Sequence, residues 1–149
     1  MTRFRENFKG LALGAMLVLW SAGVCADEQD DIEYRQHIMK TMDEQTALLN
    51  MILQHKAAPD NFTVHAKVLA ISAAMAKKSF DSKAAGGNAK PAVWAAWADF
   101  SKRMDALAAA TDDLVKSAAS GGVALAGAKV PAVLASCKSC HDEYMVPKK

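Results

Sequence analysis

The chain has 149 residues with 18 basic and 16 acidic side chains, which gives a formal net charge of +2. A chain of this length is typical of one folded domain. Three basic residues and one acidic residue fall within the first 26 positions, so the remaining 123 residues carry 15 charges of each sign. A balanced chain is not expected to bind nucleic acid, which usually requires an excess of basic residues.

The N-terminus has the pattern of a secretory leader. Basic residues precede an apolar run from Leu11 to Trp20, which is too short for a membrane-spanning helix of about 20 residues. Small residues follow and predict cleavage after Ala26, which leaves residues 27–149 as a single mature domain. Lipid attachment at Cys25 is an alternative that the bulky Val24 disfavours. Because no other apolar run is long enough to cross a membrane, we expect a soluble periplasmic protein without stable membrane insertion.

The mature sequence has the composition and periodicity of helices. Alanine is abundant and apolar residues recur every three or four positions, whereas the alternation typical of strands is missing. Pro131 lies inside the last expected helix and should kink it or mark a new start after Gly127. Four amphipathic helices with short loops predict an all-α, antiparallel four-helix bundle. The expected helices cover about 30–54, from 60 to a loop at 79–90, 91 to about 121, and 123–145.

A short motif near the C-terminus carries the chemistry. Cys137, Cys140 and His141 form the pattern C-x-x-C-H, the attachment signature of a c-type haem. Two thiols at this spacing can form thioether bonds to two vinyl groups on one porphyrin edge, and the histidine can then bind the iron. Structural zinc usually requires four ligands, a thioredoxin-like motif requires a strand–helix setting, and a disulfide leaves the histidine unexplained. The motif predicts one covalently bound haem c with His141 as the proximal iron ligand.

These features resemble the class II cytochromes c, the family of cytochrome c-prime and its low-spin relatives. The resemblance implies a four-helix bundle with the haem attached near the C-terminus. It also implies that Arg35 lies near a haem propionate and that Met39, one turn later, faces the distal side of the iron. Met145 departs from the family pattern, which often has arginine at this position. The similar segments are Tyr34-Arg35-Gln36 with Met39, Phe80-Asp81-Ser82-Lys83, Lys90-Pro91 with Trp94 and Phe100, and Cys137 to Tyr144.

The group opposite His141 on the iron decides the function. Met39 is the expected distal ligand, because it lies one helical turn after Arg35 on the same face and because the resemblance implies it. Ligation by histidine and methionine favours electron transfer, so we expect a periplasmic electron-carrier cytochrome. The alternative is a five-coordinate, cytochrome c-prime-like protein that binds small gases such as nitric oxide or carbon monoxide. Three other residues are weaker candidates for the sixth ligand of the iron: Met42, His37 and Met145.

The expected partners are periplasmic redox proteins, or a larger oxidoreductase in which the chain is an electron-donating subunit. The resemblance also implies a homodimer through the first two helices as a further assembly. No Ser/His/Asp arrangement, phosphate-binding loop or carboxylate pair occurs at a useful spacing. The sequence therefore does not support an enzymatic activity.

Overall fold

The computed structural model describes residues 27–147, and every helix or strand assigned within this range is a helix. This confirms the all-α prediction. The predicted leader at residues 1–26 lies outside the described residues. The helices are α1 (Glu28–Leu53), α2 (Phe62–Ala76), α3 (Ala92–Ala95), α4 (Trp97–Gly127) and α5 (Val130–Tyr144), with 3₁₀ turns at Pro59–Asn61 and Lys77–Phe80.

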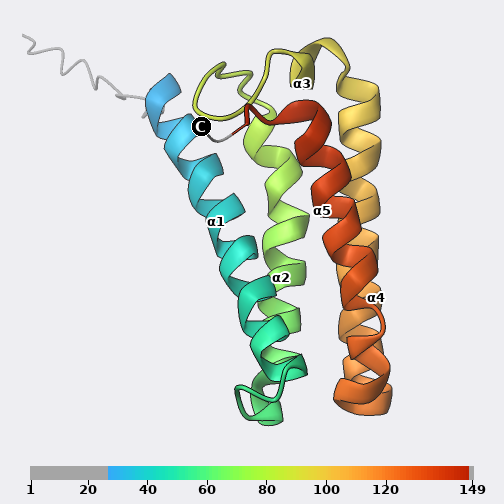
Figure 1. Ribbon diagram of the computed structural model, residues 1–149. Coiled ribbons are helices and arrows are strands. Elements are labelled where there is room, and N and C mark those ends of the chain that lie inside the picture. Colours follow the sequence, from blue (N-terminus) through green and yellow to red (C-terminus); the bar gives the residue numbers. More distant parts are fainter. Residues whose placement is uncertain (1–26, 148–149) are drawn as a thin grey trace, which may run out of the picture.

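The four long helices alternate in direction and form an up-and-down bundle (Figure 1). The central helix α2 packs against both α1 and α4, and α4 packs against α5. In contrast, α1 and α5 have little direct backbone contact. The space between them is the part of the bundle that holds the site described below.

Local sequence explains the limits and the buried face of α1. Asp27 and Asp30 form a capping box at its start, and acidic side chains in the first turn interact favourably with the helix dipole. Ile38, Met42 and Leu49 recur at spacings of four and seven and are all buried. The helix begins and ends within two residues of the predicted limits, because both the cap and the apolar period are local signals.

The loop after α2 packs back on α1. The 3₁₀ turn that follows α2 ends at Phe80, close to the predicted start of the loop. Gly87 has φ +60°, and a Cβ atom there would come within 2.6 Å of the Gln36 side chain and 2.9 Å of Ile32. Only glycine permits this backbone conformation and this close approach without a clash. The loop therefore covers the first turns of α1, next to Arg35.

The prediction of one continuous third helix from Pro91 is wrong. The structure has a single turn, α3, which Ala96 (φ −115°, ψ 41°) separates from α4. The Trp94 indole N–H donates to the Phe80 carbonyl at 3.0 Å, and Val93 is buried in the core. These tertiary contacts fix the short turn against the loop and the core, and the helix is interrupted at Ala96.

Gly122 and Pro131 shape the connection between α4 and α5. Gly122 has φ +63° and ψ −159°, so α4 bends at its predicted end and then continues to Gly127. α5 starts at Val130 with Pro131 in its first turn, where the missing N–H of proline is not needed. The predicted start of the fourth helix at Val123 is therefore wrong, whereas a new start after Gly127 is confirmed.

None of the described helices is, by itself, both long and apolar enough to span a membrane. Among the helices of residues 27–147, the consecutive pair of α4 and α5, which meet at an angle of 81°, satisfies the length and composition criteria jointly.

Candidate functional site

A cavity of about 770 Å³ opens between α1, α4, α5 and the loop before α3. This volume lies within the range of about 300–1,000 Å³ that is typical of ligand and cofactor sites. All five residues that the sequence predicted for the site line this one cavity. Its wall includes Arg35, Met39 and Met42 of α1, Phe80 and Val93 of the connecting segment, Phe100, Arg103 and Met104 of α4, and Leu134, Cys137, Cys140, His141 and Tyr144 of α5.

Cys137, Cys140 and His141 line the cavity from α5. Their spacing of three and four residues places them on one face of the helix. Both cysteines are half-buried and unbridged. Burial is the main cause that raises the pKa of each thiol, so both are protonated at neutral pH. Within residues 27–147, no group of three or more His, Cys, Asp or Glu is placed to hold a metal ion.

Arg35 is a buried cation on the α1 wall, with only 3% of its surface exposed. Its Nη2 donates to the Ala84 carbonyl at 3.0 Å, and the guanidinium lies 4.7 Å from the centre of the Phe80 ring. Its Nη1 is buried and has no hydrogen-bond partner among the described residues. Burial lowers the pKa of Arg35, while the charge of Asp31 opposes this shift. Because an unpaired buried N–H group is costly, this wall fits an anionic group such as the propionate that the resemblance implies.

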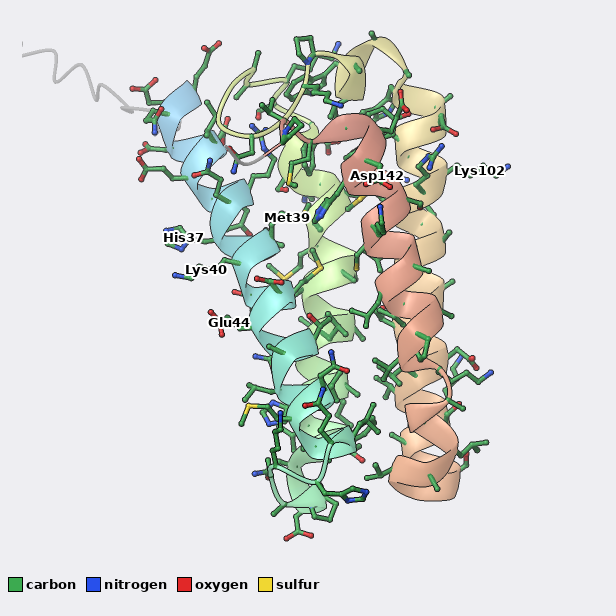
Figure 2. The ribbon with its side chains drawn as sticks, in the orientation of Figure 1. His37, Met39, Lys40, Glu44, Lys102 and Asp142 are labelled. Carbon is green, nitrogen blue, oxygen red and sulfur yellow. The ribbon has the colours of Figure 1, made fainter. Side chains whose placement is uncertain are left out.

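The α1 side chains that could face the iron differ in direction. Met39 is half-buried and points from α1 toward the interior, whereas His37 is exposed and points outward (Figure 2). His37 is not part of the cavity wall, so it is not placed to serve as a ligand. Met42 lines the cavity but is 6% exposed and belongs to the hydrophobic core. Met39 is therefore the best-placed residue on the wall across from α5.

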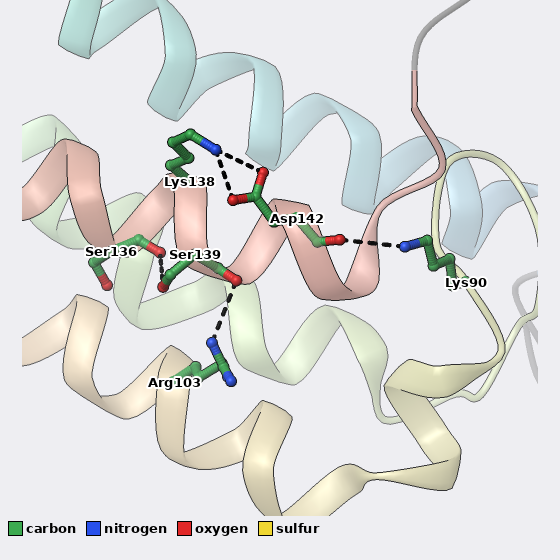
Figure 3. A network of polar contacts seen from close by, with 6 residues as sticks. All are labelled: Lys90, Arg103, Ser136, Lys138, Ser139 and Asp142. Carbon is green, nitrogen blue, oxygen red and sulfur yellow. Dashed lines mark hydrogen bonds and ion pairs between the residues drawn. The ribbon is translucent and has the colours of Figure 1, made fainter.

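Lys90 holds the end of α5, which the sequence did not lead us to expect. Its Nζ donates to the Glu143 carbonyl at 2.9 Å. It also donates to the Asp142 carbonyl at 3.3 Å (Figure 3). Its backbone N–H donates to the Tyr144 carbonyl at 2.9 Å. These bonds satisfy carbonyls that a helix end leaves without partners, and a cation is favourable at this end of the helix dipole. The segment that carries the cysteine motif is therefore fixed at its C-terminal end.

Asp99 and Arg103 of α4 also bind this segment. Arg103 Nε and the Tyr144 hydroxyl both donate to Asp99 Oδ2, each at 2.6 Å, and Arg103 Nη1 donates to the Ser139 carbonyl at 3.3 Å. The bond to Asp99 raises the pKa of Tyr144 to about 12, and the bonds from Tyr144 and Arg103 lower the pKa of Asp99. The only sequence signal was the i, i+4 spacing of the Asp–Arg pair, which ordinary surface pairs share.

Comparison with known proteins identifies the family. A family model described as Cytochrome C' matches residues 30–145. The chain belongs to the cytochrome c' family. Cytochrome c' of Rhodopseudomonas palustris is 33% identical over 147 residues, which cover 93% of this chain and 97% of the relative. Cytochrome c' of Rubrivivax gelatinosus is 32% identical over 121 residues, which cover 77% of this chain and 93% of the relative.

Solved structures of cytochrome c prime from Alcaligenes xylosoxidans share the fold. The ferric protein superimposes with a TM-score of 0.77 at 27% identity, covering 83% of this chain and 98% of that chain. The nitric oxide complex of one variant has a TM-score of 0.77 at 26% identity, with 83% and 99% covered. A carbon monoxide-bound variant has a TM-score of 0.76 at 27% identity, with 82% and 98% covered. The four-helix bundle and the resemblance to class II cytochromes c are thereby confirmed.

Proteins of the cytochrome c' family bind a covalently attached haem c. The described residues fit such a group in three ways. The cavity has the volume of a cofactor site, two protonated thiols and a histidine lie together on one wall, and a buried cation on another wall has an unpaired donor. The predicted cofactor is confirmed at the level of the family.

Proposed function

We propose that this cytochrome binds small gases such as nitric oxide or carbon monoxide at a five-coordinate haem. The observation that carries the proposal is its likeness, over 82–83% of the chain, to cytochrome c prime structures solved with nitric oxide or carbon monoxide bound. The relatives found by sequence are also named cytochrome c'. The gas-binding alternative considered from the sequence is therefore better supported than the electron carrier that we expected first.

In this proposal, haem supplies the iron that binds the gas, and the residues of the cavity hold and enclose it. Cys137 and Cys140 provide the two thioether attachments from α5, and His141 provides the proximal ligand. Arg35 Nη1, which has no partner among the described residues, donates to a propionate. Three of these residues hold the haem from α5, and the fourth, Arg35, binds its propionate from α1.

Met39 faces the distal side in this proposal without bonding the iron. Its side chain is half-buried on the cavity wall, and the thioether group is flexible and fills irregular space. A gas molecule then enters only as this side chain moves aside. The half-buried position of Met39 on the cavity wall also supports the second candidate function, an electron carrier in which the Met39 sulfur is the sixth ligand.

Titration of the reduced protein with carbon monoxide tests the proposal. We expect one molecule bound per haem, with the absorption change complete on mixing at saturating gas. A reduced protein whose spectrum does not respond to saturating carbon monoxide would contradict the proposal and favour the electron carrier.

Arg35→Gln is expected to raise the pKa of a haem propionate, because loss of a buried cation disfavours the carboxylate. The pH range in which the reduction potential changes should then lie higher than in the wild type. The free energy of unfolding should also fall by about 1–3 kcal/mol, since the buried Ala84 carbonyl loses its donor. Potentiometry at several pH values and urea unfolding measure the two effects. Lys67→Gln is the control, because Lys67 is exposed on α2 and does not line the cavity. Lower stability with an unchanged pH profile would show that Arg35 holds only the loop.

We also propose that the protein acts in the periplasm, where redox partner proteins keep its iron reduced. The motivation is the leader pattern of residues 1–26 together with a covalent haem site. The intact mass of protein from a periplasmic fraction should correspond to a chain that begins at Asp27 and carries one haem. A mass that includes residues 1–26 would contradict this.

A homodimer through α1 and α2 is a further proposal. Val64, Ile71 and Met75 of α2 are 55%, 62% and 44% exposed, and their spacing places them on one outward face. Ile71→Glu is expected to weaken the dimer about 100-fold or more, because an unpaired buried charge costs about 3 kcal/mol or more. Sedimentation velocity measures the change, with Leu125→Glu on α4 as the control. A wild-type monomer, or an Ile71→Glu protein of unchanged mass, would refute the dimer.

A further inference from the structure

The contacts of Asp99 and Arg103 lie on both sides of the proposed iron ligand. Ser139, which accepts from Arg103, precedes His141 by two residues, and Tyr144, which donates to Asp99, follows it by three. Asp99 and Arg103 lie one turn apart on α4 and are themselves joined at 2.6 Å. One pair of side chains on α4 therefore fixes the last two turns of α5 at two points. Figure 3 shows the arginine reaching the Ser139 carbonyl.

We propose that Asp99 and Arg103 are positioning residues that hold the His141 segment against α4 and tune the reduction potential of the haem through their opposite charges. This inference rests on the proposed attachment of haem to Cys137, Cys140 and His141. It gives a role in the site to two residues that do not themselves attach the haem.

The side chains of Arg103 and Asp99 are 36% and 50% exposed, and what distinguishes them from an ordinary surface ion pair is their further contacts with α5. A surface pair is worth about 0–1 kcal/mol, because its charges stay hydrated and its side chains stay mobile. Here a single carboxylate oxygen accepts two short bonds, one from Arg103 and one from the largely buried Tyr144. The guanidinium also lies 5.8 Å from the centre of the Tyr144 ring. Charge-assisted bonds that share one acceptor restrict both donors, so α5 is held in one position relative to α4.

Both charges lie beside the cavity that the attachment motif lines. Arg103 is itself part of the cavity wall. Asp99 is joined to Arg103 and to Tyr144, which also lines the cavity. The haem occupies this same cavity in the proposed site, so both charges are expected to act on the iron, with opposite signs.

Single substitutions separate tuning from a merely structural role. Arg103→Gln removes a positive charge, and this loss favours oxidised iron. The ratio of reduced to oxidised protein at a fixed solution potential should therefore fall. Asp99→Asn removes a negative charge, so the same ratio should rise. We expect changes of about two- to fivefold, the size that partly exposed charges produce. Arg103→Lys keeps the charge and should restore a ratio close to that of the wild type.

The controls use a second ion pair, which joins α4 to the 3₁₀ turn after α2. Lys77 bonds Asp105 of α4 at 2.9 Å, and neither residue lines the cavity. Lys77→Gln and Asp105→Asn should therefore leave the ratio unchanged. Tyr144→Phe changes no charge but releases one attachment, so it should shift the iron–histidine band of the reduced protein in resonance Raman spectra with little change in the ratio.

The measurement is spectroelectrochemistry of purified holoprotein for each variant, after haem staining has shown that the cofactor is covalently attached. Opposite shifts for Arg103→Gln and Asp99→Asn, with silent controls, are the expected result. Shifts in the same direction, or no shift in either variant, would overturn the inference while leaving the attachment site intact. A wild-type protein without covalent haem would instead refute the attachment itself.

Discussion

Replacing Cys137 and Cys140 together by serine is expected to abolish covalent haem attachment. Serine cannot form the thioether bonds, and the structure describes no other cysteine in residues 27–147. Haem staining of a denaturing gel should therefore fall to background, whereas the wild type retains the stain. This is the largest effect that we expect from any change in the chain.

The loss of haem should also change the packing of the bundle. A dry cavity costs about 24 cal/mol per Å³, so an empty space of about 770 Å³ would cost more than the total stability of about 5–15 kcal/mol that is typical of domains. Water entering through the open mouth lowers this cost but comes into contact with the apolar side chains of the cavity wall, which include Met42, Phe100 and Met104. We expect helices that persist in far-ultraviolet circular dichroism, with the near-ultraviolet signal lost and dye binding increased.

Cys25→Ser is the matched control, because it makes the same chemical change outside the motif. Since Cys25 falls in the predicted leader, this variant should keep both its haem stain and its near-ultraviolet signal. Haem that survives denaturation in the Cys137→Ser, Cys140→Ser protein would show that the attachment lies elsewhere and would refute the proposed site.

Met39→Ala is expected to speed the binding of carbon monoxide by about tenfold. Moving a packed side chain aside costs on the order of 1–2 kcal/mol, and each 1.4 kcal/mol in a barrier is a factor of ten in rate. Alanine removes the obstacle on the distal wall, while the oxidised protein should stay high-spin because no iron–sulfur bond is lost. Stopped-flow mixing of the reduced protein with carbon monoxide measures the rate.

Met145→Leu is the control for this prediction, because it replaces a methionine on the cavity wall that follows the proximal His141. It should leave the association rate within about twofold of the wild type, since small packing changes cost little. An unchanged rate in Met39→Ala would show that this side chain does not restrict access. A change from a low-spin to a high-spin spectrum would show that Met39 was a ligand.

The sequence predicted those parts of the fold that local signals determine. The apolar period of the first helix placed its limits within two residues. Pro131 and Gly127 predicted a new helix start at α5 as one of two outcomes, the other being a kink. The break at Ala96 was missed because its cause is tertiary, a hydrogen bond from Trp94 to the Phe80 carbonyl. Nothing near Ala96 in the sequence marks it as the end of a helix.

The candidate site likewise contains residues that the sequence predicted and residues that it missed. The spacing of Cys137, Cys140 and His141 is itself the chemical signal, so the attachment was predicted directly. Asp99 and Arg103 were missed, because their spacing is that of many exposed pairs and only the fold brings α5 against them. Whether a methionine sulfur bonds the iron or only faces it depends on the distance between the two atoms, which residue types and spacing do not determine.

The absorption spectrum of the oxidised, purified protein tests the central claim most directly, because it reports whether a sixth protein ligand is present. The account predicts a high-spin ferric spectrum in which Met39 does not bond the iron held by His141. A low-spin spectrum with a methionine-sulfur-to-iron charge-transfer band in the near infrared would contradict it and identify an electron carrier.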